Sequence, residues 1–107
     1  MTKIVFRPKH FDIKITGHAQ HGKVGEDIVC SAVSILFYTL AESITESRNM
    51  LKAEPIIEND DGNGHIQCVP KPEYEANVSL IYWTILNGFN LLANEYKKNV
   101  KLVIKGA

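Results

Sequence analysis

The chain has 107 residues, which is long enough for one domain to bury a core without disulfides or a structural metal. Hydrophobic residues make up 45% of it and charged residues 22%, as in an ordinary soluble globular protein. Twelve basic residues balance twelve acidic ones, so the net charge favours neither direct nucleic-acid binding nor a membrane surface.

Two strands and a helix are predicted in the N-terminal half. The segment 3–7, KIVFR, is rich in β-branched and aromatic residues, and the segment 11–16, FDIKIT, alternates apolar with polar residues. Both are predicted strands, and we expect them to pair antiparallel. From Ile28 onward, apolar residues recur every three to four positions, which predicts an amphipathic helix of about five turns. Asp27 lies where the N-cap of this helix is expected.

The C-terminal half repeats the alternation of strands and helix. Residues 50–70 predict two strands around the turn DDGNG, whose residue types tolerate positive φ. Residues 72–100 predict a second long helix, and the alternating segment 100–105 predicts a last strand. No run is expected to reach the length of a membrane span, and the N-terminus carries no apolar signal segment.

The element order is therefore ββαββαβ. It predicts an α+β, or mixed α/β, fold class with one sheet of about five strands packed with two long helices. No linker or repeat divides the sequence, so residues 1–107 are predicted to form a single domain. Cys30 and Cys68 are too few for a disulfide framework, and free thiols favour a cytoplasmic protein. Cys68, beside Ile66 in a predicted strand, is interpreted as structural.

Cys30 occupies a position suited to nucleophilic chemistry. With Asp27 as N-cap, Cys30 is the third helical residue, near unpaired backbone N–H groups and the positive end of the helix dipole. This environment stabilises a thiolate, which is the nucleophile of cysteine enzymes. His18, at the end of the second predicted strand, could pair with Cys30 across the loop between them. Ser34 lies four residues further along the same helical face as Cys30.

The loop 19–26 separates the two candidate catalytic residues. Gly22 and Gly25 allow it to bend sharply or to move, and we expect a flexible loop that orders over a substrate.

Each of these residues also has a purely structural interpretation. A free cysteine such as Cys30 is more often a buried core thiol than a nucleophile, and a single histidine such as His18 is most often on the surface. Asp27 is expected to cap the helix, although a carboxylate beside a thiolate opposes ionisation of the thiol unless it is turned to backbone N–H groups. Ser34 could bond a substrate or bond back to the Cys30 carbonyl.

The sequence resembles one known family over its whole length. Several short segments resemble the signature of the ribosomal-processing cysteine protease family, Prp. They are GHA at 17–19, HG at 21–22, Gly25 and DIVCSAVS at 27–34. The order ββαββαβ and the chain length also agree with that family. The resemblance places Cys30 on the family nucleophile and His18 on its histidine, with Asp27 and Ser34 on motif positions of less certain role.

The resemblance implies a specific activity. Members of the family are small dimeric bacterial cysteine proteases that remove an N-terminal extension from large-subunit ribosomal protein twenty-seven, before or during ribosome assembly. The expected partners are therefore this extended peptide and a second copy of the chain, with no direct nucleic acid and no membrane. In the expected Cys–His dyad mechanism, His18 takes the Cys30 proton, and backbone N–H groups at the helix start, including that of Cys30, are candidate oxyanion donors. No metal or organic cofactor is expected.

Three other functions remain open on the sequence. The first is a non-catalytic ribosome-assembly interaction protein, which would keep its biological effect after Cys30→Ala. The second is a metal site formed by His18, His21 and Cys30, although this spacing fits no common zinc module. The third is a redox-sensing thiol at Cys30, which would react with peroxide without peptide turnover.

Overall fold

The structure is a computed structural model that describes residues 1–17 and 27–106. Its element order confirms the predicted ββαββαβ arrangement, with three short 3₁₀ turns added. The strands are β1 (Thr2–Arg7), β2 (Asp12–Thr16), β3 (Ile56–Asp60), β4 (Asn63–Gln67) and β5 (Val100–Ile104). The helices are α1 (Ile28–Glu46) and α2 (Glu75–Glu95), and the 3₁₀ turns are η1 (Pro8–His10), η2 (Arg48–Met50) and η3 (Pro72–Tyr74).

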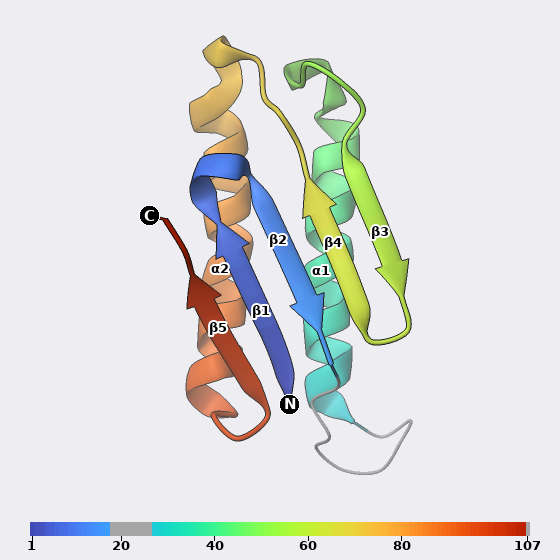
Figure 1. Cartoon of the computed structure of the whole chain (residues 1–107), viewed down its shortest axis with the longest axis vertical. Helices are drawn as coiled ribbons and strands as arrows, with labels where there is room; N and C mark the ends of the chain where they lie inside the picture. Colours follow the sequence, from blue (N-terminus) through green and yellow to red (C-terminus); the bar gives the residue numbers. More distant parts are fainter. Residues whose placement is uncertain (18–26, 107) are drawn as a thin grey trace.

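The strands form one sheet in the order β3-β4-β2-β1-β5 (Figure 1). Neighbouring strands are antiparallel, as predicted for β1 and β2, except that β1 and β5 run parallel. Phe6 of β1 therefore lies opposite Ile13 of β2 and Ile104 of β5. This pairing places the first and last strands side by side.

Both helices cover the same face of the sheet, and the other face carries no described element (Figure 1). The alternation of the strands explains this arrangement, because every second side chain points to the helices. Ile4, Phe6 and Ile13 are at most 1% exposed on that face. The helices close the core from the other side with a second group of buried side chains, which includes Val29, Val33, Phe37, Leu40, Val78, Tyr82 and Phe89.

The second helix begins and ends inside its predicted range. Pro72 has no N–H to donate, and Pro72–Tyr74 form the separate turn η3, so α2 starts at Glu75 rather than at residue 72. The two helices approach closely at Gly88, where an added Cβ would lie 2.7 Å from Cδ2 of Leu36. This glycine therefore serves helix packing.

The prediction that no run reaches the length of a membrane span is wrong for α1. By length and composition alone, Ile28–Glu46 is long and apolar enough to cross a membrane. A core helix passes the same test, and α1 buries Val29, Val33, Phe37, Leu40 and Ile44 in the domain. It also exposes Ile28 and Ile35, which are 62% and 63% accessible.

Candidate active site

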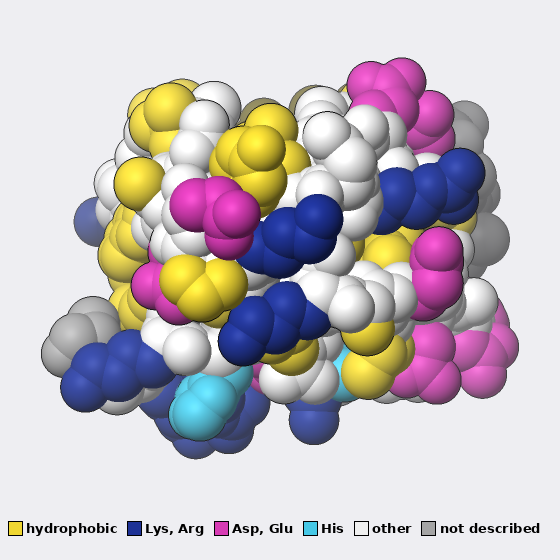
Figure 2. Space-filling model, turned by 90° about the horizontal axis from the view of Figure 1, so that it is seen from above, with side chains coloured by type: hydrophobic (Ala, Val, Ile, Leu, Met, Phe, Trp, Pro, Cys, Tyr) yellow, Lys and Arg dark blue, Asp and Glu magenta, His cyan; other side chains and the backbone are white. Residues whose placement is uncertain are grey.

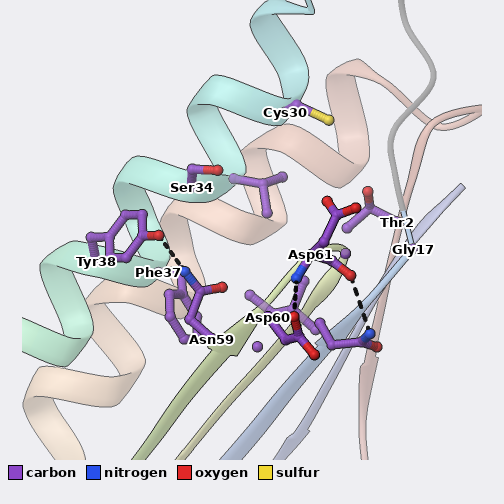
Figure 3. A pocket seen from close by; sticks show the side chains of 14 residues that line it. Thr2, Gly17, Cys30, Ser34, Phe37, Tyr38, Asn59, Asp60 and Asp61 are labelled. Atoms are coloured by element: carbon purple, nitrogen blue, oxygen red, sulfur yellow. Dashed lines mark hydrogen bonds between the residues drawn. The ribbon is translucent and has the colours of Figure 1, made fainter. Parts of the chain in front are cut away.

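A cavity of about 440 Å³ opens between α1 and the turn that joins β3 to β4 (Figure 3). Its apolar lining comes from Ile15, Val33 and Phe37, and its polar lining from α1 and from the β3–β4 turn. The full set of lining residues is Thr2, Ile15, Gly17, Cys30, Val33, Ser34, Phe37, Tyr38, Asn59, Asp60, Asp61, Gly62, Asn63 and Gly64. The cavity can therefore accept a side chain with both apolar and polar parts.

Cys30 lines this cavity from the first turn of α1. It is a free, half-buried thiol, and it packs against the edge of the core rather than within it. Figure 3 shows its sulfur beyond the helix backbone on the cavity side. The structure therefore contradicts the interpretation of Cys30 as a buried core thiol.

Asp27 caps α1 as predicted. Its φ of −76° and ψ of 100° are extended, and its carboxylate Oδ1 accepts hydrogen bonds from Val29 N at 2.9 Å and Cys30 N at 3.0 Å. This geometry satisfies two of the N–H groups that a helix start leaves unpaired. It also turns the carboxylate toward the backbone, which is the arrangement that reduces its conflict with a thiolate.

The same cap alters one mechanistic expectation. The Cys30 N–H was a candidate donor to the oxyanion, but it already donates to Asp27 Oδ1. A tetrahedral oxyanion would have to compete with a charged carboxylate for this donor, so the expectation for the Cys30 N–H is wrong for this structure.

Ser34 faces the cavity one turn after Cys30 (Figure 3). The sequence left open whether its hydroxyl bonds back to the Cys30 carbonyl. Among the described residues, the serine of this helix that bonds back is Ser31, whose Oγ donates to Asp27 O at 3.2 Å, and Ser34 makes no such bond. The Ser34 hydroxyl is therefore placed for a ligand in the cavity.

The β3–β4 turn supplies the cavity residues that the sequence analysis missed. The segment DDGNG was interpreted only as a turn, yet Asp60 and Asp61 line the cavity opposite Cys30. Asp60 Oδ1 accepts from Asp61 N at 2.8 Å, which holds the turn together. On α1, the Tyr38 hydroxyl accepts a hydrogen bond from the Asn59 side-chain amide and ties the helix to β3. The sequence could have indicated Tyr38, because it lies four residues after Ser34 on the helical face that carries Cys30.

Gly17 anchors the end of β2 beside the cavity. Its N–H donates to Gly62 O of the β3–β4 turn at 2.7 Å, and its φ of +87° lies in the region that favours glycine. An added Cβ would lie 2.3 Å from the Met1 carbonyl oxygen. A glycine is thus required at the residue directly before His18.

Several predicted residues lie outside the described part of the chain. His18, the loop 19–26 with Gly22 and Gly25, and His21 all belong to the undescribed segment, so their roles stay predictions. Among residues 1–17 and 27–106, no group of three or more His, Cys, Asp or Glu side chains could hold a metal ion.

The second cysteine has a contrasting environment. Cys68 is 4% exposed, and its sulfur accepts a hydrogen bond from the hydroxyl of buried Tyr82 at 3.6 Å. Burial raises the pKa of the Cys68 thiol, and this effect outweighs the opposing effect of the Tyr82 hydrogen bond. Burial also raises the pKa of Tyr82. Cys68 is therefore structural, as the sequence predicted.

His65 of β4 belongs to a network of charged side chains. Its ring lies between two carboxylates, with Nε2 hydrogen-bonded to buried Asp12 and Nδ1 3.3 Å from Glu58. Arg7 lies 3.6 Å from the same Asp12 carboxylate. This network crosses the outer face of the sheet, which is the face that the helices leave uncovered. It does not line the cavity that contains Cys30.

Comparison with known proteins agrees with this site. Residues 1–101 match the sequence model of the family described as cysteine protease Prp. A Staphylococcus aureus protein named ribosomal processing cysteine protease Prp is 30% identical over 94 residues, which cover 88% of this chain and 86% of the relative.

Two crystal structures of the S. aureus protease are also similar. The structure with a covalently linked product peptide has a TM-score of 0.80 and 29% identity, and covers 98% of this chain and 100% of that one. The structure with a substrate peptide has a TM-score of 0.69 and 27% identity, with 97% of each chain covered.

Proposed function

The chain belongs to the Prp family of cysteine proteases, and from this premise we propose that it is an endopeptidase with Cys30 as its nucleophile and His18 as its general base. The observation that carries the proposal is the position of Cys30. Its thiol lies on the first turn of α1 and opens into the 440 Å³ cavity, where a peptide can reach it.

Chain continuity supports His18 as the partner of Cys30. Gly17 lines the same cavity as Cys30, and consecutive Cα atoms across a trans peptide are about 3.8 Å apart. The last described residue before His18 is therefore at the cavity. The hydrogen bond from Gly17 to Gly62 fixes the position of Gly17.

The proposed substrate is the N-terminal extension of large-subunit ribosomal protein twenty-seven. Support comes from the S. aureus relative, which is named for ribosomal processing and has been crystallised with a covalently linked product peptide. Ile15, Val33 and Phe37 give the cavity an apolar floor that suits an apolar or aromatic side chain beside the scissile bond.

The proposed chemistry has two steps. His18 takes the Cys30 proton, the thiolate sulfur attacks the scissile carbonyl carbon, and the resulting tetrahedral oxyanion collapses to a thioester as the amine leaves with the proton from His18. Water, activated by the same imidazole, then attacks the thioester, which releases the new carboxylate and returns the proton to the sulfur. Asp27 supports the site by holding the start of α1, and Ser34 contacts the bound peptide.

We propose that the protein acts in the cytoplasm as a homodimer that pairs through its helix layer. Between Ala76 and Asn94, α2 contains no charged residue, although Leu80 and Leu91 are 68% and 70% exposed. Exposed Ile28 and Ile35 of α1 belong to the same layer. Depletion of charge with exposed aliphatic side chains is typical of the core of a protein interface. Sedimentation of Leu80→Lys/Leu91→Lys tests this, because the variant should be monomeric.

Incubation with the extended ribosomal protein, followed by mass spectrometry, tests the function. We expect one cut that releases the extension, with loss of activity in Cys30→Ala and His18→Ala. Cys68→Ala is the matched control that should retain cleavage. An unaltered substrate mass with the wild-type chain, or cleavage that survives Cys30→Ala, would contradict the proposal. A biological effect that survives Cys30→Ala would instead indicate the non-catalytic interaction protein.

A further inference from the structure

The zero net charge of the chain conceals a charged surface on the sheet. On β1, alternation turns Ile4 and Phe6 to the helices, so Lys3, Val5 and Arg7 point to the uncovered face. Strand β5 runs parallel beside β1 (Figure 1), and its Lys101 and Val103 pair with Lys3 and Val5, so they share that face.

Two further cations complete this surface. Lys14 of β2 pairs with Val5 on the same face. Lys105 N donates to Phe6 O at 2.9 Å, which continues the β1–β5 pairing and places Lys105 beside Arg7. We call this surface the basic face, and it consists of Lys3, Arg7, Lys14, Lys101 and Lys105 around Val5 and Val103.

The basic face is built at an electrostatic cost. Lys3 and Lys101 are directly paired, and like charges directly opposite one another in a sheet are destabilising. Among the described residues, no carboxylate forms an ion pair with Lys3, Lys14, Lys101 or Lys105, whereas Arg7 pairs with Asp12. An anionic partner would relieve the repulsion.

One carboxylate, that of buried Asp12 on β2, adjoins the basic face, where it is held by Arg7 and His65. Glu58 lies on the uncovered face of β3, at the opposite edge of the sheet from β5. At the end of the molecule shown in Figure 2, by contrast, basic and acidic side chains are intermingled. The excess of basic side chains is thus a property of the β2-β1-β5 surface and not of the whole chain.

We propose that the basic face binds the phosphate backbone of single-stranded RNA. The five cations form an open surface that can follow a phosphate chain, and among the described residues of β1, β2 and β5 no aromatic side chain on this face offers a base-stacking platform. Binding is therefore independent of sequence. An acidic protein fits less well, because protein interfaces need buried aromatic or aliphatic anchors, and this face supplies only half-buried Val5 and Val103.

Fluorescence anisotropy with a labelled 20-nucleotide single-stranded uridine RNA tests the proposal. For up to five phosphate contacts at about −0.7 each, the slope of log K against log salt approaches about −3.5, which is roughly a 100-fold loss of affinity between 50 and 200 mM salt. Lys3→Gln/Lys101→Gln should weaken binding at least tenfold at 50 mM salt, and should make the slope shallower by about 1.4.

The matched control is Arg48→Gln/Lys52→Gln, which removes the same charge from two exposed residues off the basic face. It should change the affinity less than twofold. Thermal melting and peptide cleavage by both double variants check folding, because neither pair lines the cavity. Absence of RNA binding at 50 mM salt, or equal losses in both double variants, would overturn the proposal. So would self-association through the basic face at low salt in place of RNA binding, which would make the partner a second copy.

Discussion

The two cysteines show how the same side chain serves opposite purposes in two regions of one core. Cys30 lies on the first turn of α1 and opens into a cavity, whereas Cys68 lies directly after β4 beneath the hydroxyl of Tyr82. Both touch the hydrophobic core, but only the surroundings of Cys68 exclude water. Position on the fold, and not residue type, therefore decides which thiol is available for chemistry.

The largest expected effect is a direct contrast in reactivity between the two thiols. Iodoacetamide at pH 7.5 should label Cys30 at least about 100-fold faster than Cys68, because labelling of Cys68 requires a local opening that costs roughly 3 kcal/mol. Peptide mapping of alkylated sites against time measures both rates in one sample. Equal rates, or faster labelling of Cys68, would remove the basis of the comparison.

A second prediction concerns the backbone that supports the cavity. Gly17→Ala should destabilise the protein by about 2 kcal/mol or more, because its φ of +87° strains an alanine and the new Cβ meets the Met1 carbonyl. Urea denaturation measures the free energy of unfolding. Gly106→Ala is the matched control, since Gly106 also has a positive φ but nothing within 4 Å of an added Cβ. A loss in Gly17→Ala no larger than in this control would show that the contact with Met1 relaxes freely.

The N-cap of α1 gives a smaller effect in the Cys30 region. Asp27→Ala should cost about 1 kcal/mol, because it leaves the N–H groups of Val29 and Cys30 without their acceptor. Asp27→Asn should cost less than half of that, since asparagine caps a helix nearly as well. Thermal melts of the three proteins compare them, and equal destabilisation by both substitutions would assign the effect to charge instead of capping.

The smallest effect concerns Cys68 at alkaline pH. Because burial raises its pKa in the folded state, its contribution to stability is complete below the unfolded value of about 9.0 and is lost as pH rises toward the folded value. At pH 9.5 the loss from this residue is at most about 0.8 kcal/mol. Cys68→Val should reduce the alkaline loss of stability, which melts between pH 8 and 9.5 would measure. An unchanged pH dependence would show that other groups, such as Tyr82, cause it.

The sequence predicted the elements well because each carries a local signal. The alternation of β2, the helical period after Ile28 and the cap at Asp27 depend on neighbours within a few residues, and all are present in the structure. Strand order was not predictable, since the parallel pairing of β1 with β5 depends on contacts between distant segments.

The candidate site was predictable only in part. Cys30 and Ser34 were found because they share one helical face. The sequence analysis missed Asn59, Asp60 and Asp61, because the pairing of β3 with β4 and of β4 with β2 brings them to the cavity. A turn sequence indicates the geometry of the turn but not which part of the fold the turn faces. Likewise, the basic face could not be recognised from a balanced charge count, because its members come from three strands that are separated in sequence.

The parallel β1–β5 pair has a consequence for synthesis of the chain. Thr2 pairs with Val100 and Phe6 with Ile104, so β1 lacks one of its two neighbours until residues 100–104 have been translated. Contacts at such sequence separation slow folding, because the chain between them must first lose its loop entropy. While residues 100–104 are still in the exit tunnel, β1 remains an open edge in the nascent domain. We therefore expect the protease domain to complete its sheet only after residues 100–104 have left the exit tunnel.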